Sequence, residues 1–211
     1  MKIYAIAVND RVPIIDISRH RLGIDGEGIT TLVVFHGCEL CCRYCINPQT
    51  LQTNETKAVM YTVDELHERI RVDSLYFMAT NGGVTFGGGE PLLNFRFIKD
   101  FKKICDANWR IYVETSLNVP VGNVKSLLGV VDEWIVDVKS LNDDIYKKYT
   151  GKVNTRMFEN LDFLCDNNKQ DSVLIRLPLI PGYNTEDDRC KSRERLELMG
   201  FKRFDLFNYI K

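Results

Sequence analysis

Four cysteines lie within eight consecutive residues, and they are the side chains of this sequence best suited to chemistry. They are Cys38, Cys41, Cys42 and Cys45. Three thiolates from one tight loop can bind three irons of a cubane 4Fe-4S cluster, and the fourth iron then has no protein ligand. Such an open iron can bind a substrate or a cofactor. The loop therefore predicts one iron-sulfur cluster with a chemical task.

Zinc is the main alternative, because it also binds closely spaced cysteines, and a structural zinc site normally has four ligands. No second cysteine pair follows at the distance typical of a zinc finger or ribbon, since Cys105, Cys165 and Cys190 are isolated in the sequence. His36 is too close to Cys38 to complete a tetrahedron easily. The spacing thus favours a cluster over zinc, or over cysteines that only pack in the core.

The choice of three cysteines among four depends on the residue before the last one. Cys38, Cys42 and Cys45 form the pattern C-x-x-x-C-x-aromatic-C, which resembles the cluster motif of radical S-adenosylmethionine (SAM) enzymes. In that resemblance Tyr44 lies against the adenine of SAM, although an aromatic residue can also serve only packing. Cys41 allows the reverse spacing with Cys38 and Cys45. We predict that Cys38, Cys42 and Cys45 bind the cluster.

The composition is that of an ordinary globular enzyme. With 211 residues, of which 45% are hydrophobic, the chain can bury a core of its own, and we expect a single domain over residues 1–211. Its 28 basic and 29 acidic residues are evenly mixed and give a net charge of -1. This distribution lacks the positive surface of a nucleic-acid-binding protein. A nucleic-acid partner is therefore not expected.

The cysteines and the N-terminus indicate the compartment. Seven cysteines, an odd number, make a poor disulfide framework, and a cluster of low potential needs reducing surroundings. The apolar run within residues 1–10 is too short for a signal peptide, and no segment approaches the ~20 apolar residues that cross a membrane. We expect a cytoplasmic protein that is not embedded in a membrane.

Short apolar runs alternate with amphipathic stretches, which predicts an α/β fold of alternating strands and helices. Ile3–Val8 and Val12–Ile17 flank Asn9-Asp10 and predict an N-terminal β-hairpin within residues 1–20. Further strands are expected at 29–35, 83–86, 110–115, 133–138, 172–178 and 203–207, and helices at 63–72, 95–106, 123–128, 142–149, 156–166 and 187–199. These units predict a partial (β/α)6 barrel over residues 29–211, with ligands at the carboxyl ends of its strands.

The strand expected at 83–86 runs into the sequence Gly87-Gly88-Gly89-Glu90-Pro91. Glycines let the backbone approach a ligand closely, and Glu90 can accept hydrogen bonds from an ammonium group. A flexible turn between strand and helix is the simpler interpretation of a glycine run. At a strand end beyond the cysteine loop, however, the segment resembles the GGEP element with which radical SAM enzymes hold the amino group of SAM. The implied contacts are Gly88, Gly89 and Glu90.

Five segments together resemble the glycyl-radical-enzyme activating enzymes, a family of radical SAM enzymes that includes pyruvate formate-lyase activating enzyme. The family patterns are, in order, D-G-P-G-x-R, Y-C-H-N-P, S-G-G-E-P, D-x-K and R-x-x-x-[IV]-P-G. The matching segments are Ile24–Ile29, Tyr44–Pro48, Phe86–Pro91, Trp134–Leu141 and Arg176–Asn184. The chain departs from the family at Ile46, where the family has His, at Gly87, and at Glu114–Leu117, where the family has D-T-N-G.

The resemblance implies a SAM site on neighbouring strand ends. Lys139 and Arg176 are the implied partners of the SAM carboxylate, whose planar pair of oxygens suits Arg especially. Glu114, Thr115 and Asp137 resemble a group that binds a monovalent cation beside that carboxylate, because a hard cation prefers oxygen ligands. An ion pair between Glu114 and Lys139 is an equally simple interpretation of these side chains.

The resemblance also implies the reaction and its partners. The family consists of oxidoreductases of anaerobic metabolism that cleave SAM at a 4Fe-4S cluster. The resulting 5′-deoxyadenosyl radical abstracts hydrogen from a glycine of a glycyl radical enzyme. A flavodoxin or ferredoxin is the implied electron donor, and we expect a monomer.

Two other functions stay open. One is a radical SAM enzyme that acts on a small molecule or a peptide, similar to 7-carboxy-7-deazaguanine synthase, which Asp25–Gly28 and Glu114-Thr115 also resemble. The D-x-K strand and Pro181-Gly182 favour the activating enzymes over this group. The other is a non-catalytic iron-sulfur or zinc module, against which the segment from Gly87 to Pro91 argues.

The choice of Cys42 over the adjacent Cys41 as a cluster ligand can be tested by single substitutions. Cys42→Ala should lose iron because it removes one of three cluster ligands, whereas Cys41→Ala should keep the full cluster. Iron and sulfide content per chain after anaerobic reconstitution measures both. A full cluster in Cys42→Ala, together with a loss in Cys41→Ala, would show that Cys41 is the ligand instead.

Overall fold

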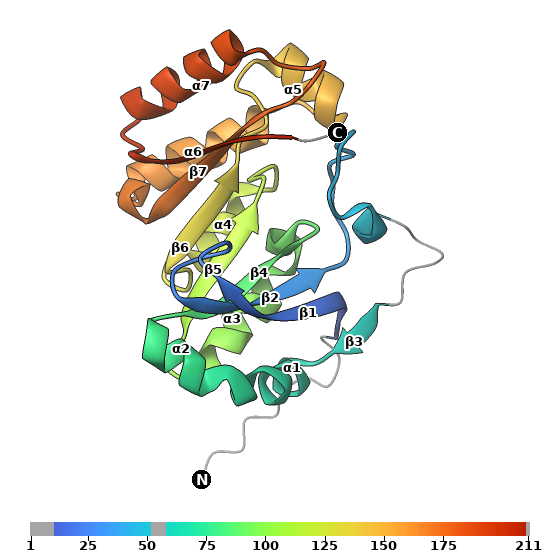
Figure 1. Cartoon of the computed structure of the whole chain (residues 1–211), viewed down its shortest axis with the longest axis vertical. Helices are drawn as coiled ribbons and strands as arrows, with labels where there is room; N and C mark the ends of the chain where they lie inside the picture. The colour runs from blue at the N-terminus through green and yellow to red at the C-terminus, as the bar shows by residue number, and fades with distance from the viewer. Residues whose placement is uncertain (1–10, 52–57, 210–211) are drawn as a thin grey trace.

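The apolar runs predicted as strands lie side by side in one curved sheet (Figure 1). The structure is a computed structural model, and it describes residues 11–51 and 58–209. The eight strands have the order β3-β1-β2-β4-β5-β6-β7-β8. They are β1 Val12–Leu22, β2 Ile29–Phe35, β3 Val59–Tyr61, β4 Gly83–Gly88, β5 Arg110–Thr115, β6 Glu133–Asp137, β7 Val173–Leu179 and β8 Arg203–Asn208.

From β2 onward, each strand of this order is parallel to the next. Parallel neighbours need long connections, which are usually helices, and helices cover the outer side of the sheet (Figure 1). They are α1 Val63–Ile70, α2 Ser74–Thr80, α3 Phe95–Ile104, α4 Val121–Leu127, α5 Asp143–Thr150, α6 Thr155–Asp166 and α7 Glu186–Leu198. The partial barrel of six alternating strands and helices is confirmed. In the described part of the chain, no helix is long and apolar enough to span a bilayer.

The N-terminal part differs from the prediction in its pairing. Val12–Ile17 belongs to the longer strand β1, which pairs antiparallel with β2 on one side and with β3 on the other. Its expected hairpin partner, Ile3–Val8, lies outside the described residues. The sequence did not predict β3 and α2. A strand of three residues has too short a pattern, and α2 exposes Leu75 and Met78, so its apolar residues do not mark one buried face.

The hydrophobic core lies between the sheet and the helices that cover it. Phe35 of β2 stacks on Phe86 of β4 with ring centroids 5.6 Å apart. The ring of Phe86 meets that of Phe101 in α3 edge-on at 5.5 Å. Because side chains alternate along a strand, Leu32 and Val34 of β2 point to the opposite side and line the interior of the barrel.

The turn between β1 and β2 closes the amino end of the barrel. The hydroxyl of Thr85 donates a hydrogen bond to the Asp25 carbonyl at 2.5 Å, and Glu27 forms an ion pair with Arg110 at the start of β5. A Cβ on Gly26 would lie 2.7 Å from the ring of Tyr112, so only glycine allows this close approach. The barrel is therefore filled at this end by the D-G-x-G segment, and its opposite end is left for a ligand.

A buried carboxylate connects the first strands to the segment before α2. Asp73 is fully buried and accepts hydrogen bonds from Arg19 Nε at 2.9 Å and from the Thr31 hydroxyl at 2.9 Å. His20 Nε2 lies 3.2 Å from the same carboxylate. Burial alone would raise the pKa of Asp73, but the hydrogen bonds from Arg19 and Thr31 outweigh it and lower that pKa.

This carboxylate predicts an acid-sensitive contribution to stability. A lowered pKa in the folded state stabilises the protein above the unfolded pKa of about 4, and this stabilisation is lost as the pH falls through the folded pKa. Asp73→Asn should lower the free energy of unfolding by about 1–3 kcal/mol at neutral pH, because it leaves buried donors without their acceptor. Urea unfolding between about pH 7 and pH 3 should show the difference from wild type shrinking. A difference that does not change with pH would contradict this role.

Candidate active site

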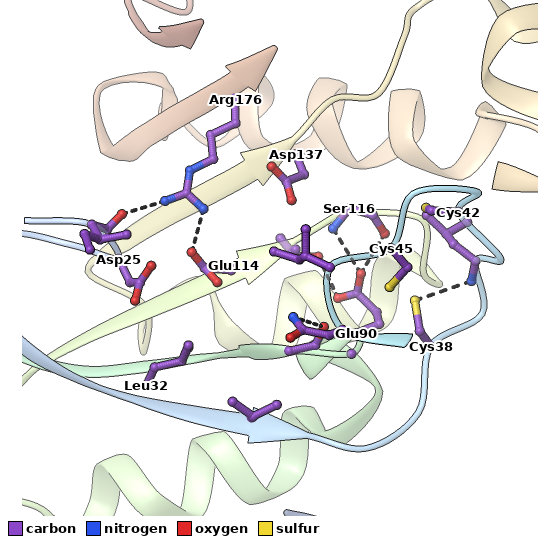
Figure 2. Close-up of a pocket in the computed structure, with 18 of the residues that line it drawn as sticks. Asp25, Leu32, Cys38, Cys42, Cys45, Glu90, Glu114, Ser116, Asp137 and Arg176 are labelled. Carbon is purple, nitrogen blue, oxygen red and sulfur yellow. Dashed lines mark hydrogen bonds and ion pairs between the residues drawn. The ribbon is translucent and has the colours of Figure 1, made fainter. Parts of the chain in front are cut away.

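The predicted site residues, with the exception of Tyr44, line one cavity of about 550 Å³. This volume is within the range of about 300–1,000 Å³ that is common for ligand sites. Figure 2 shows the cysteines at one end and Arg176, Glu114 and Asp25 at the other. The predicted residues that line the cavity are Cys38, Cys42, Cys45, Gly88, Gly89, Glu90, Glu114, Thr115, Asp137, Lys139 and Arg176.

The cysteine loop follows β2 and is held at both ends by backbone hydrogen bonds. At its start, the Gly37 N–H donates to the Thr50 carbonyl at 2.9 Å. Farther along, the Cys41 N–H donates to the Thr150 carbonyl at 2.8 Å, and the Arg43 N–H donates to the Tyr149 carbonyl at 3.1 Å. The last carbonyls of a helix have no partner within the helix. The end of α5 therefore binds the loop where it turns its thiols inward.

The loop separates Cys41 from the other three cysteines. Cys38, Cys42 and Cys45 line the cavity, whereas Cys41 is exposed and does not. The Leu40 N–H donates a hydrogen bond to the Cys38 sulfur at 3.4 Å, which favours a thiolate there. The arrangement brings together the cysteines that the aromatic spacing selected.

The donor set of the cavity fits an iron-sulfur cluster with one open iron. Among the described residues, no fourth cysteine and no histidine lines the cavity. No three His, Cys, Asp or Glu side chains within residues 11–51 and 58–209 converge on one point as ligands of a single metal ion. A cubane cluster takes its cysteines at separate irons, so the three thiols suit a cluster better than zinc.

Without metal, the buried thiols are protonated. Burial raises the pKa of Cys38 to about 12 and that of Cys42 to about 11. Iron must displace these protons because only the thiolate is a good ligand. Assembly of a cluster is therefore expected to release protons.

The glycine run after β4 packs directly against the start of the cysteine loop. The Gly89 N–H donates to the Phe35 carbonyl at 3.0 Å, and the Glu90 N–H donates to the Gly37 carbonyl at 2.8 Å. A Cβ on Gly89 would lie 2.1 Å from the Gly37 carbonyl oxygen, and Gly88 has a φ of +92°. Both positions therefore require glycine. The run packs closely against the cysteine loop and forms one wall of the cavity.

The carboxylate of Glu90 is held by partners within the protein, and a contact with SAM stays a prediction. Its carboxylate is almost fully buried and accepts hydrogen bonds from the Thr115 hydroxyl at 2.6 Å, the Ser116 hydroxyl at 2.7 Å, the Ser116 N–H at 3.0 Å and the Leu92 N–H at 3.3 Å. Burial raises the pKa of Glu90, and these hydrogen bonds oppose that change. A carboxylate has about four acceptor positions, so none is left for an ammonium group. The carboxylate joins the ends of β4 and β5.

Lys139 projects from the end of β6 and is buried with two partners. Its Nζ lies 3.2 Å from an Asp137 oxygen and 3.3 Å from the hydroxyl of Tyr209, which also lines the cavity. Burial alone would lower the pKa of Lys139, but the Asp137 carboxylate outweighs it and raises that pKa. Lys139 is therefore charged at neutral pH. An ammonium group has three donors, which leaves one for a ligand.

Arg176 on β7 binds the carboxylate of Glu114, for which Lys139 was the expected partner. Its Nη1 lies 2.6 Å from Glu114, and its Nη2 donates to the Ile24 carbonyl at 2.6 Å. The expected ion pair between Glu114 and Lys139 does not form. Glu114 instead pairs with Arg176, and Lys139 pairs with Asp137. The register places Arg176 on β7 beside Asp137 on β6, and the long Arg176 side chain extends across β6 to Glu114 on β5. Burial raises the pKa of Glu114, and Arg176 opposes this change.

The same contacts bear on the expected monovalent cation. Glu114 is neutralised by Arg176, Asp137 by Lys139, and the Thr115 hydroxyl donates to Glu90. The three residues therefore do not fit a separate cation, since the protein supplies the positive charge itself.

Tyr44 is the one predicted contact that does not line the cavity. Its ring packs edge-on against Tyr183 at 5.7 Å and Tyr149 at 6.2 Å. Its hydroxyl donates to the Pro181 carbonyl at 3.4 Å. A contact between Tyr44 and adenine stays a prediction. Ile46, two residues on, is largely exposed and lines the cavity instead.

Two residues with clear roles were missed in the sequence. Tyr209 follows β8 and reaches Lys139, although 70 residues separate them. Ser116 donates twice to Glu90. A serine after a strand and a tyrosine near the C-terminus carry no pattern by themselves, so only the fold identifies them.

Comparisons with known proteins show the family of the chain. The model of the radical SAM superfamily matches residues 32–190. A pyruvate formate-lyase 1-activating enzyme of Escherichia coli is 33% identical over 173 residues, which are 78% of this chain and 67% of that protein. A pyruvate formate-lyase-activating enzyme of Staphylococcus epidermidis is 33% identical over 198 residues, which are 88% of this chain and 76% of that protein.

Solved structures show the same fold at low identity. Streptococcus suis SuiB bound to S-adenosylmethionine has a TM-score of 0.64 and 15% identity, covering 82% of this chain and 39% of that one. Methylornithine synthase has a TM-score of 0.60 and 13% identity, covering 86% of this chain and 53% of that one. With the family model and the sequence relatives, these findings lead to one conclusion. The chain belongs to the radical SAM superfamily and, within it, to the family of the pyruvate formate-lyase-activating enzymes.

Proposed function

We propose that this chain abstracts hydrogen from a glycine of a partner glycyl radical enzyme, with a 4Fe-4S cluster on Cys38, Cys42 and Cys45 and with SAM as the source of the radical. The observation that carries the proposal is that three thiols, a wall of glycines and two cationic side chains line one cavity. When bound, the cluster and SAM supply a one-electron cleavage of the S–C5′ bond, which gives methionine and a 5′-deoxyadenosyl radical.

The chain's own residues orient SAM in this proposal. The carboxylate of SAM binds Lys139 and Arg176, which keep free donors beyond their contacts with Asp137 and Glu114. Because all acceptor positions of Glu90 are occupied, the amino group of SAM is held by backbone carbonyls of the glycine wall. Arg176 lies in the middle of β7 and Lys139 two residues after the end of β6, so the sheet fixes the position of both side chains.

The reaction needs no acid or base from the protein. With cluster and SAM bound, the radical would take the hydrogen atom from the glycine Cα, which would give 5′-deoxyadenosine and leave the unpaired electron on the glycine. The task of the chain is to admit one C–H bond and to exclude water and oxygen. The match to the activating enzymes favours a protein substrate over a small molecule.

We further propose that a flavodoxin or ferredoxin supplies the electron to the cluster. The enzyme acts as a monomer of one domain in the cytoplasm.

The direct test is anaerobic. The protein is loaded with iron and sulfide, mixed with SAM and dithionite, and given pyruvate formate-lyase that carries deuterium at its glycine Cα positions. We expect 5′-deoxyadenosine that contains deuterium, and a glycyl radical signal in the partner. Cys42→Ala should give neither. Deoxyadenosine without deuterium would refute this protein as the substrate, and no deoxyadenosine from a fully loaded enzyme would refute the cleavage.

Arg176 gives a prediction about SAM binding alone. Arg176→Lys keeps the charge but loses the planar pair of donors, so the dissociation constant of SAM should rise about tenfold, or 1.4 kcal/mol. Arg110→Lys is a matched control, since Arg110 is also half-buried and paired with a glutamate, but at the closed end of the barrel. Calorimetric titration of the cluster-loaded proteins measures both. Equal affinity of wild type and Arg176→Lys would exclude Arg176 from the site.

A further inference from the structure

The last strand of the sheet, β8, has one free edge beside the cavity. It ends the strand order and, among the described strands, pairs with β7 alone. The Tyr209 N–H, just after β8, donates to the Leu179 carbonyl of β7 at 3.0 Å. In a parallel pair every second residue directs its backbone groups to the partner strand, so Asp205 and Phe207 face β7 and Leu206 faces away. The N–H and C=O of Leu206 therefore point into the space beside β8.

Nothing in the described structure occupies this edge. Within residues 11–51 and 58–209, no hydrogen bond reaches the N–H or C=O of Leu206. Proteins usually protect an open strand edge with proline, lysine or a bulge, because it can pair with another chain. The strand β8 contains neither proline nor lysine, and it pairs with β7 without a shift in register. The edge is therefore able to accept an added strand.

The inner side of β8 belongs to the cavity. Asp205 and Phe207 line it, and across the opening β1 contributes Asp16 and Ser18. The short strand β3 covers the outer edge of β1 only over Val12–Ile14. The wall of the cavity is thus open between β8 and the rest of β1. A segment that paired with the free edge of β8 would lie in this opening.

The pairing geometry determines which atoms of an added strand meet the cavity. Side chains alternate along a strand, so every second residue of the added strand faces the interior of the barrel. At such a position any other residue presents its Cβ, whereas a glycine presents a hydrogen of its Cα. The hydrogen atom that the proposed radical removes is of this kind. Backbone pairing alone would therefore aim the correct C–H bond at the cavity.

The charge at the opening indicates a further property of the bound segment. Asp16 is exposed and, in the described part of the chain, has no ion pair. On the other side, Asp205 is half exposed and lies 3.5 Å from Arg176 Nε. That guanidinium group already pairs with Glu114. Two carboxylates thus flank the opening, and this favours a segment that carries a basic side chain.

We propose that the glycine-bearing segment of the partner binds as an extended strand on the free edge of β8, with its glycine facing the cavity and a basic side chain near Asp16. In this mode of recognition, main-chain hydrogen bonds supply the affinity and alternate side chains supply the specificity. The inference rests on the proposed function and deepens it, because it states how the partner's glycine reaches the radical.

Binding of a peptide tests the pairing without turnover. The probe is a fluorescent synthetic peptide centred on the radical glycine of pyruvate formate-lyase, titrated by anisotropy into cluster-loaded, oxidised protein with SAM. Leu206→Pro removes the outward N–H but no bond to β7, a change that edge strands tolerate. It should raise the dissociation constant of the peptide about tenfold, because one main-chain hydrogen bond is lost. Leu206→Ala keeps the N–H and should bind within about twofold of wild type.

Methyl groups on the peptide backbone test the same pairing from the other side. Paired strands exchange hydrogen bonds at every second residue. Methylation of the peptide nitrogens that face β8 should therefore weaken binding about tenfold, and methylation of the nitrogens between them should have little effect. This measurement uses the wild type, so it decides alone if Leu206→Pro fails to fold or to bind SAM. Weakening that does not alternate along the peptide would contradict a paired strand.

Asp16→Asn tests the basic side chain. Two further peptides differ only by a lysine or a glutamate at the next position on the same face as the glycine. Wild type should prefer the lysine peptide about fivefold, and Asp16→Asn should lose this preference. Asp64→Asn is a matched control, since Asp64 in α1 is also exposed and has no ion pair within the described ranges. It should keep the preference.

The outcomes separate this inference from the proposed function. Equal affinity of folded Leu206→Pro and wild type, or no peptide binding to a wild type that holds cluster and SAM, would overturn docking on β8. A wild-type dimer that Leu206→Pro abolishes in sedimentation would assign the edge to a second copy of the chain and would overturn it as well. Failure of the reduced wild type to cleave SAM would instead refute the proposed function.

Discussion

The buried carboxylate of Glu90 is the contact on which the site depends. It accepts hydrogen bonds from Thr115 and Ser116 at the end of β5, and its own N–H donates to Gly37 at the start of the cysteine loop. One residue thereby joins the ends of β2, β4 and β5. A buried carboxylate is costly unless its acceptor positions are satisfied, and here they are. The walls that face the cluster are therefore positioned before any ligand binds.

Glu90 is satisfied by neutral donors, but most other charged side chains of the cavity are paired with a charge of opposite sign. Arg21 pairs with Asp25, Arg176 with Glu114, and Lys139 with Asp137. Breaking such a pair would leave an uncompensated charge at a large cost in free energy. A zwitterion such as the methionine part of SAM suits this arrangement, because it adds one charge of each sign. The protein's own cations also explain why the three oxygen-bearing residues do not fit a separate monovalent cation.

The sequence was informative wherever the pattern is local. The strands β2, β4, β5, β6, β7 and β8 were recognisable from apolar runs, and the cysteine loop and glycine run from their spacing. Contacts between distant segments were not recognisable: Glu90 meets Thr115 across 25 residues and Lys139 meets Tyr209 across 70. The exchange of partners between Glu114, Lys139 and Arg176 has the same origin, because strand register decides which charges meet. The antiparallel pairing of β1 with β2 was missed because it depends on the packing of the whole sheet and not on a local sequence pattern.

The central claim is that three cysteines leave one iron open and that SAM binds it. Pulsed electron paramagnetic resonance on the reduced, cluster-loaded protein tests this directly, with SAM that carries ¹⁵N in its amino group. We predict a hyperfine coupling between the cluster spin and this nitrogen, since the amino group would bind the open iron. A fully reduced cluster with SAM bound, but without coupling to the nitrogen, would contradict the account.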